Sequence, residues 1–223
     1  MAASQPPLTL IVAATVKNGI GKNGGLPWPM LKKEMAYFAR VTKRVPQQQA
    51  EQSSDSKKSA QNVVVMGRKT WESIPPKFRP LKDRTNMIIS TKSAESFGPA
   101  RDDVIVAQDI EAGLKSLDTK SKKGDARPAG RVFVIGGSSI YDTALRMPNA
   151  KHILLTRVYN EYDCDTSFPV DLDSSDAQGS GWTRQSHGRL QEFVDEQLDD
   201  ADMEEKTEDT VVRYRFTLYE RQD

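Results

Sequence analysis

Short apolar runs recur along the chain and indicate β-strands. Each run is rich in β-branched residues and nearly continuous in apolar character, which is typical of strands covered on both faces. The clearest runs are residues 8–14, 62–66, 87–90, 104–106, 132–135 and 153–155. Because such strands occur mainly in parallel sheets, the pattern predicts a largely parallel sheet.

Segments with helical character lie between these runs. They are residues 31–42, 69–73, 110–117 and 138–145. In the first, Leu31, Met35 and Phe38 fall at helical spacing. Residues 191–194 and 211–219 alternate apolar and polar positions, as an antiparallel edge pair would. The chain is therefore predicted to be α/β, with a mixed, mostly parallel sheet of about eight strands, an antiparallel C-terminal edge strand and flanking helices.

Three polar stretches interrupt this pattern. Residues 45–61 and 119–130 are rich in Ser, Lys and other polar residues, and residues 195–209 are strongly acidic. None of the three shows apolar periodicity, so we expect solvated loops or insertions. The sequence predicts one domain over residues 1–223 that carries these three insertions.

Composition narrows the class of protein. The 223 residues include 32 Lys and Arg against 31 Asp and Glu, so a net charge of +1 argues against nucleic acid and membrane surfaces as partners. No run approaches the roughly 18 apolar residues of a membrane helix, and the N-terminus lacks the positive flank of a signal peptide. One cysteine and two histidines leave little for disulfides or zinc. These features predict a cytoplasmic enzyme without a protein-bound metal, with a nuclear enzyme as the alternative.

Residues 19–24 (GIGKNG) match the G-x-G-x-x-G pattern that follows the first strand of a dinucleotide-binding Rossmann fold. In that fold a helix starts within the glycines, whereas here residues 26–29 (LPWP) intervene. We therefore interpret residues 18–25 as a mobile glycine-rich loop; a plain surface loop is the alternative.

Two predicted strands end in glycines before a predicted helix. Gly67 precedes Arg68, Lys69 and Thr70, and Gly136-Gly137 precedes Ser138. Helix N-termini present amide donors and partial positive charge, so both places are candidate phosphate sites. The alternatives are an exposed basic turn in the first case and a tight turn without ligand in the second.

Glu34 lies on the apolar face of the first predicted helix, three residues after Leu31 and four before Phe38. Burial would raise the pKa of its carboxyl, and a ligand with paired N–H donors would satisfy both oxygens. The alternative is an ordinary ion pair with Lys33 or Arg40, and spacing alone favours that alternative.

Taken together, these segments resemble the eukaryotic dihydrofolate reductase family. The likeness runs in order from about residue 8 to residue 219 and includes residues 11–13 (IVA), 19–24, 26–29, Glu34, Tyr37, Phe38, 66–75 (MGRKTWESIP), 79–81 (RPL), Arg84, 136–139 (GGSS), Tyr141, Thr156, Arg157 and 165–169 (DTSFP). The resemblance implies NADPH-dependent reduction of 7,8-dihydrofolate, with hydride transfer to pterin carbon 6. It also implies a cis bond between Gly136 and Gly137.

The resemblance also implies the roles of individual residues. Glu34 would hold the pterin and assist protonation of the adjacent ring nitrogen, aided by Trp28, Thr156 and Leu26. The other substrate-binding residues would be Ile11, Val12, Phe38, Ser73, Ile74, Phe78, Leu81, Arg84, Ile135 and Tyr141. Of these, Arg84 would fork onto the glutamate carboxylate of the substrate.

The residues that would bind NADPH come from four segments. They are Ala13, Gly19, Ile20, Gly21, Lys22, Asn23, Gly24 and Gly25; Gly67, Arg68, Lys69 and Thr70; Ser90, Thr91 and Lys92; and Gly136, Gly137, Ser138, Ser139, Ile140, Tyr141, Asp142 and Thr143. Thr91 stands where the family often has an arginine against the 2′-phosphate, with Lys92 next to it.

Two other functions stay open from the sequence. One is a reductase of the same fold that acts on another heterocycle, although such a substrate would not need Arg84. The other is a module that binds NADPH or RNA without catalysis, but the basic stretches are short and lack interleaved aromatic residues. The resemblance further implies antifolate binding and a monomer.

Overall fold

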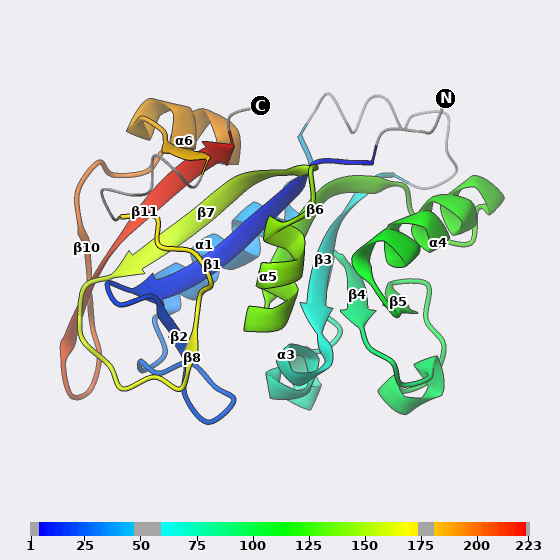
Figure 1. Ribbon diagram of the computed structural model, residues 1–223, viewed down its shortest axis with the longest axis horizontal. Helices are drawn as coiled ribbons and strands as arrows, with labels where there is room; N and C mark the ends of the chain where they lie inside the picture. The colour runs from blue at the N-terminus through cyan, green and yellow to red at the C-terminus, as the bar shows by residue number, and fades with distance from the viewer. Residues whose placement is uncertain (1–4, 47–58, 174–180, 222–223) are drawn as a thin grey trace. The chain divides into compact units, whose positions relative to one another are not determined.

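The structure is a computed structural model that describes residues 5–46, 59–173 and 181–221 (Figure 1). The chain forms two compact units. Unit 1 consists of Met1–Leu8 and Thr42–Asn149, and unit 2 of Thr9–Val41 and Ala150–Asp223. The chain therefore passes three times from one unit to the other. The single-domain organisation over residues 1–223 stays a prediction.

Unit 1 contains a parallel sheet in the order β6 (Ala129–Gly136), β3 (Gln61–Gly67), β4 (Thr85–Ile89) and β5 (Val104–Ala107). Residues 62–67 of the interior strand β3 are all buried. This burial confirms the interpretation of continuous apolar runs as strands covered on both faces.

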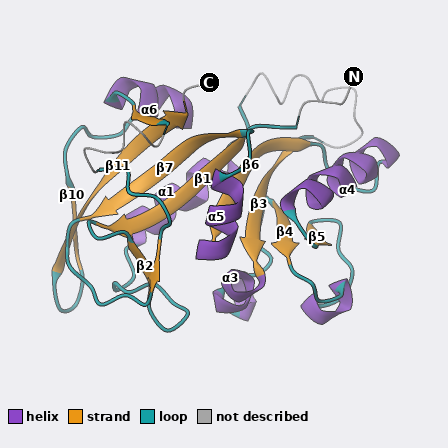
Figure 2. Cartoon of the chain, viewed as in Figure 1, coloured by secondary structure: helices purple, strands orange, loops and turns teal. Residues whose placement is uncertain are grey.

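Helices follow the strands of unit 1, as Figure 2 shows. They are α3 (Arg68–Ser73), α4 (Ile110–Lys123), α5 (Ser138–Leu145) and the short 3-10 helices η1 (Pro76–Phe78) and η2 (Ala94–Phe97). α5 contacts β3 and β6, while α4 contacts β4, β5 and β6. The bounds of α5 are those predicted from the sequence, and α3 and α4 begin within one residue of their predicted starts.

Unit 2 contains strands in the order β10 (Met203–Lys206), β11 (Val211–Arg221), β7 (Ala150–Val158) and β1 (Leu8–Thr15); β9 (Trp182–Arg184) also pairs with β11. The pairings of β11 with β7, β9 and β10 are all antiparallel. With parallel and antiparallel strands and helices after many of them, the predicted α/β class with a mixed sheet is confirmed.

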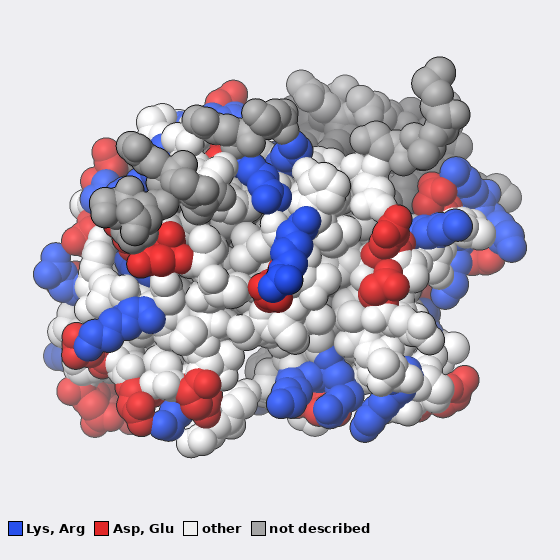
Figure 3. Space-filling model, viewed as in Figure 1, with Lys and Arg blue, Asp and Glu red and all other residues white. Residues whose placement is uncertain are grey.

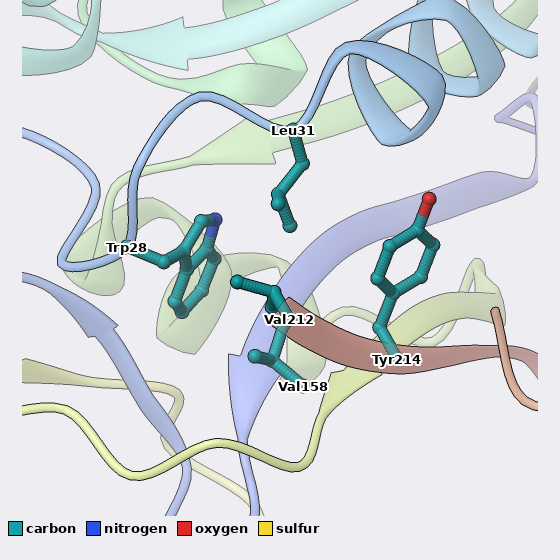
Figure 4. Packing of buried hydrophobic residues seen from close by; sticks show 5 residues of the cluster. All are labelled: Trp28, Leu31, Val158, Val212 and Tyr214. Carbon is teal, nitrogen blue, oxygen red and sulfur yellow. The ribbon is translucent and has the colours of Figure 1, made fainter. Parts of the chain in front are cut away.

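Helix α1 (Lys32–Lys43) of unit 2 lies behind β1 and β7 in Figure 1. The chain enters it over a buried cluster formed by Trp28, Leu31, Val158, Val212 and Tyr214, drawn in Figure 4. Trp28 and Leu31 precede the helix, and the other three residues come from β7 and β11. The entry to α1 is thus packed on the sheet of its own unit.

The predicted C-terminal strand pair is wrong in two respects. Residues 191–194 belong to helix α6 (His187–Val194), in which Leu190, Phe193 and Val194 are buried at helical spacing and Ser186 caps the N-terminus. Alternation over four residues does not separate a strand from one helical turn. β11 pairs with β10 as well as with β7, so it lies inside the sheet and not at its edge.

The three polar stretches are also not simple loops. β10 lies within residues 195–209. Residues 119–123 form the last turn of α4, where three lysines lie at the favourable negative end of the helix and Gly124 ends it with φ +81°. Ala129 and Gly130 already belong to β6. Of residues 45–61, positions 47–58 lie outside the described residues, and Gln61 begins β3.

The glycine-rich segment at residues 18–25 is not a plain loop. β2 (Gly19–Gly21) pairs with β8 (Thr166–Ser167), and Lys22 and Gly25 exchange two backbone hydrogen bonds of 3.0 Å. A Cβ atom on Gly19 would lie 2.4 Å from Sγ of Cys164, so glycine permits this close approach. No helix follows until α1, which agrees with the rejection of a Rossmann fingerprint. The mobility of the segment stays a prediction.

None of the helices among the described residues is long and apolar enough to span a membrane.

Candidate functional site

A buried carboxyl group of unit 2 belongs to Glu34, in the first turn of α1. Its residue is 8% exposed, and its Oε1 accepts a hydrogen bond of 3.1 Å from the hydroxyl of Thr156 on β7. Burial raises the pKa of Glu34 from 4.5 to about 7; the hydrogen bond from Thr156 opposes this rise, and the negative charge of Glu205 adds to it. A carboxyl with this pKa can hold or release a proton near neutrality.

Glu34 does not form the ion pair that spacing alone favoured. Arg40 binds Glu196 through Nε and Nη2, at 2.9 and 2.5 Å. Lys33 has an exposed side chain, whereas its backbone N–H donates to the carboxylate of Glu205. The helix acid is therefore held by a hydroxyl from the sheet, and its desolvation is not offset by either of the two proposed cations.

The residues expected near Glu34 in unit 2 differ in exposure. Trp28 is buried and packs edge-to-face on Tyr162, with ring centroids 6.0 Å apart. Ile11 and Val12 are buried on β1, while Ala13 packs against the Trp28 cluster and Phe38 is half-buried on α1. Leu26 is 54% exposed, so its side chain is largely available to a ligand.

Glu205 on β10 was not predicted from the sequence. It is 9% exposed, its two carboxylate oxygens each lie 3.1 Å from the backbone N of Lys33, and it accepts a hydrogen bond of 3.2 Å from the Tyr214 hydroxyl. The residue lies in the acidic run at 195–209, where composition indicates solvated charge. Glu204, the preceding residue, is exposed, and no feature of the sequence distinguishes the buried glutamate from the exposed one.

In unit 1 the two candidate phosphate sites lie at neighbouring strand ends. β3 and β6 are parallel, with Met66 opposite Gly136, so Gly67 and Gly137 begin α3 and α5 side by side. A Cβ on Gly67 would lie 3.0 Å from Ile140, and a Cβ on Gly137 would lie 3.4 Å from Oγ1 of Thr70. The sequence-predicted residues Gly67, Thr70, Gly137 and Ile140 are therefore brought together.

The backbone between β6 and α5 has the conformation that the resemblance implied. The peptide bond between Gly136 and Gly137 is cis, which confirms that expectation. Gly136 has φ +117°, a conformation that residues with side chains rarely adopt, and a Cβ there would lie 3.3 Å from the ring of buried Tyr141.

Cations gather beside α3, at the lower centre of Figure 3. Nη1 of Arg68 lies 2.7 Å from Glu72 in an i,i+4 ion pair. The hydrogen bond from Arg68 lowers the pKa of Glu72, and the positive charges of Arg68, Lys92 and Arg79 lower it further, which places Lys92 within electrostatic reach of this helix. Lys69 is exposed, as is Thr91. Arg68 is therefore partly neutralised within its own helix, while Lys92 adds positive charge where Thr91 has none.

Several residues expected to bind the cofactor already have hydrogen-bond or ion-pair partners. Thr143 donates to the carbonyl of Ser139, Asp142 pairs with Arg146, and Oγ of Ser90 accepts from the N–H of Lys92. In unit 2, Lys22 pairs with Asp163, and the N–H of Asn23 donates to Asp165 at 2.7 Å. The contacts of Lys22 and Asn23 tie the glycine-rich segment to residues 163–165, and the side chains of Asp142 and Thr143 are engaged along the surface of α5.

Arg84 is 5% exposed at the start of unit 1 strand β4. Its Nε donates to the carbonyl of Lys82 at 3.0 Å, and its Nη1 donates to the hydroxyl of Thr42 at 2.8 Å. Burial lowers the pKa of Arg84 to about 10, so the guanidinium stays charged at neutral pH. The hydrogen bonds hold its plane in one orientation, which suits recognition of a planar carboxylate.

The remaining residues expected to bind substrate also lie in unit 1. Ile74, Leu81 and Ile135 are half-buried, and Phe78 is 56% exposed. Ser73 donates its hydroxyl to the carbonyl of Thr70 at 2.7 Å, so that hydroxyl already serves α3. The expected residues are thus distributed over both units, and each unit presents its own part of the set.

Comparison with known proteins gives the family. The family model described as dihydrofolate reductase matches residues 50–221. Over 97% of its length, the chain is 36% identical to the dihydrofolate reductase of Cryptococcus neoformans and covers 96% of that protein. It is 35% identical to that of Rattus norvegicus over 97% of the chain and 98% of the relative.

Two further comparisons agree. The chain is 36% identical to the dihydrofolate reductase of Schizosaccharomyces pombe over 97% of its own length, but it spans 47% of that longer protein. The solved structure of Schistosoma mansoni dihydrofolate reductase matches with a TM-score of 0.69 and 31% identity, covering 98% of this chain and 100% of the other. On this likeness of sequence and fold, the chain belongs to the dihydrofolate reductase family of oxidoreductases.

Proposed function

We propose that this chain reduces 7,8-dihydrofolate to 5,6,7,8-tetrahydrofolate with NADPH as the reductant, and so supplies one-carbon and thymidylate metabolism. The observation that carries the proposal is the buried Glu34 carboxyl, with a pKa of about 7 and a hydrogen bond from the hydroxyl of Thr156. Family membership supports the same reaction.

Glu34 would do two things in this reaction. Its two oxygens match the paired N–H donors along one edge of a pterin, in a bidentate contact that orients the ring. Its proton, available near neutrality, would reach the ring nitrogen next to carbon 6 through an ordered water. Thr156 and Trp28 would keep the carboxyl and that water in place, since Thr156 donates to Oε1 and Trp28 is locked in the buried cluster.

The residues of unit 1 fit the phosphate groups of NADPH. A glycine at the N-cap has no side-chain acceptor for the first-turn amides of α3 or α5, so an anion can take that role. The glycines also keep the two strand ends close, because a Cβ on Gly67 would press on Ile140. Arg68, Lys69 and Lys92 would add positive charge. When bound, NADPH supplies the hydride that reaches carbon 6.

Arg84 would bind the carboxylate of the substrate's glutamate tail. Its charge and its fixed plane support this role, whereas a heterocycle without such a tail would present no carboxylate to the guanidinium. We further propose that the chain acts in the cytoplasm as a monomer and binds antifolate inhibitors that share the pterin-like donor edge.

The first test is the loss of absorbance at 340 nm by NADPH, with dihydrofolate present or withheld. We expect oxidation only when dihydrofolate is present. Glu34→Gln should reduce turnover at pH 7 by about 100-fold or more, the range typical of a lost general acid, and should leave NADPH binding nearly unchanged. Normal turnover by E34Q would contradict the role of Glu34, and oxidation independent of dihydrofolate would contradict the substrate.

Arg84→Lys tests the tail carboxylate. Lysine keeps the charge but loses the planar fork, so we expect the KM for dihydrofolate to rise much more than the KM for NADPH. Steady-state kinetics with each substrate varied in turn gives both constants. Equal rises in the two constants would argue that the substitution disturbs unit 1 as a whole.

A further inference from the structure

Glu205 joins the end of unit 2's sheet to the start of helix α1. Both of its carboxylate oxygens lie 3.1 Å from the backbone N of Lys33, and the Tyr214 hydroxyl donates to it at 3.2 Å. The residue is 9% exposed, so these contacts replace water around the carboxylate. Tyr214 is itself fully buried in the cluster of Figure 4, beneath the entry to α1. The carboxylate is therefore held by donors from two elements, the backbone of α1 and the side chain of Tyr214 on β11.

The contact between Glu205 and Lys33 satisfies a backbone N–H group in the first turn of α1. The first backbone N–H groups of a helix have no partner within it, and they are usually satisfied by the side chain of the residue at the N-cap. Here a residue on β10, 172 positions along the chain, accepts from the N–H of Lys33. Glu34 is the next residue. A shift of this first turn would move the Glu34 carboxyl relative to the Thr156 hydroxyl that it contacts.

We propose that Glu205 is a positioning residue for the reductase reaction: its buried carboxylate fixes the first turn of α1 and thereby holds the Glu34 carboxyl against Thr156. The inference rests on the proposed function of Glu34. It assigns to the acidic stretch at residues 195–209 a part in catalysis that a solvated loop would not have.

The charge of Glu205 has a second consequence. The groups that act on the pKa of Glu34 are Thr156 from β7 and Glu205 from β10, and the charge of Glu34 in turn raises the pKa values of Tyr214 on β11 and Tyr37 on its own helix. Glu205 opposes ionisation of Glu34 by like-charge repulsion, and it offsets the positive end of the α1 dipole, which would otherwise favour the ionised form. Both effects have the same sign, so removal of this charge lowers the pKa of Glu34.

Glu205→Gln tests this role with little change of shape, because glutamine retains an oxygen that can accept from Lys33. Glu204→Gln is the matched control: it removes the same charge one residue away, from a side chain that is 64% exposed. We expect the alkaline fall of dihydrofolate-dependent turnover to move to lower pH in E205Q, by about 0.3 pH unit or more, a twofold change in the ionisation constant. E204Q should match the wild type.

A second readout does not need the reaction. The side-chain carboxyl of Glu34, in protein labelled with ¹³C at glutamate and assigned by its absence in E34Q, should titrate at lower pH in E205Q than in E204Q. Equal midpoints in the two variants would overturn the electrostatic part of the proposal. If the wild type reduces dihydrofolate and E34Q does not, while E205Q keeps the wild-type profile, the proposed function stands and the role of Glu205 falls.

Glu205→Asp separates position from charge. The charge is kept, but the shorter side chain cannot reach both Tyr214 and the N–H of Lys33. We expect a lower kcat for E205D, with the KM for NADPH unchanged and the pH midpoint closer to the wild type than in E205Q. An unchanged kcat would contradict the positioning role.

Discussion

Glu34 shows how far a single residue can be understood from the sequence. Its place among apolar neighbours on a helix was visible, and so were two possible outcomes, an ion pair or a buried acid. The choice between them depended on where Arg40 and Thr156 lie in space. Arg40 reaches Glu196, 156 positions away, and Thr156 comes from β7. Local spacing carries no information about either contact, which is why it favoured the wrong alternative.

The burial of Glu34 predicts a pH-dependent cost to stability. Its pKa is about 7 in the folded chain and 4.5 in the ordinary case, so the folded state binds the proton more tightly. The favourable contribution is complete below pH 4.5 and is lost as the pH rises through about 7, at a cost of about 3 kcal/mol. Glu34→Gln removes this titration.

We therefore expect the free energy of unfolding of E34Q, relative to wild type, to rise by about 2–3 kcal/mol between pH 5 and pH 8. Urea denaturation of both proteins at the two pH values measures the change. A difference that is the same at pH 5 and at pH 8 would mean that Glu34 is ionised in the folded chain throughout this range.

Elements were predicted well where local chemistry defines both ends. The glycines before Ser138 and the apolar periodicity after it defined α5, and continuous apolar runs located the interior strands of unit 1. Polar composition misled in two places. The lysines of residues 120–123 led to the prediction of a loop, although cations are favourable in the last turn of a helix. The acidic run at residues 195–209 was likewise predicted to be a loop, although it contains β10. A strand that pairs through its backbone needs few apolar side chains.

The end of α4 gives an element-scale prediction. Gly124 has φ +81°, and a Cβ added there would meet nothing within 4 Å, so Gly124→Ala strains only the backbone and should lower the free energy of unfolding by about 1 kcal/mol. Gly188 in α6 also has open space around it but no positive φ, and Gly188→Ala should raise stability by up to about 1 kcal/mol. Thermal or urea denaturation measures both, and effects of the same sign would refute the assigned helix end.

At the scale of the whole molecule, the α/β class and the mixed sheet followed from the alternation of strands and helices. The strand order did not, because pairings such as β11 with β7 join segments more than 50 residues apart. Contact between residues far apart in sequence also defines the two units, each of which contains segments from two parts of the chain. Family membership was recognisable because short motifs lie at the strand ends and helix starts of the fold, while the roles of the individual site residues stay predictions.

The most direct test of Glu34 as the proton donor is the pH dependence of dihydrofolate-dependent NADPH oxidation, measured at 340 nm for the wild type and for E34Q. We expect the wild-type rate to fall as the pH rises above about 7, where Glu34 loses its proton, and E34Q to be slow with no such fall. A wild-type rate independent of pH between 5 and 9, or an E34Q rate equal to the wild type, would contradict this role.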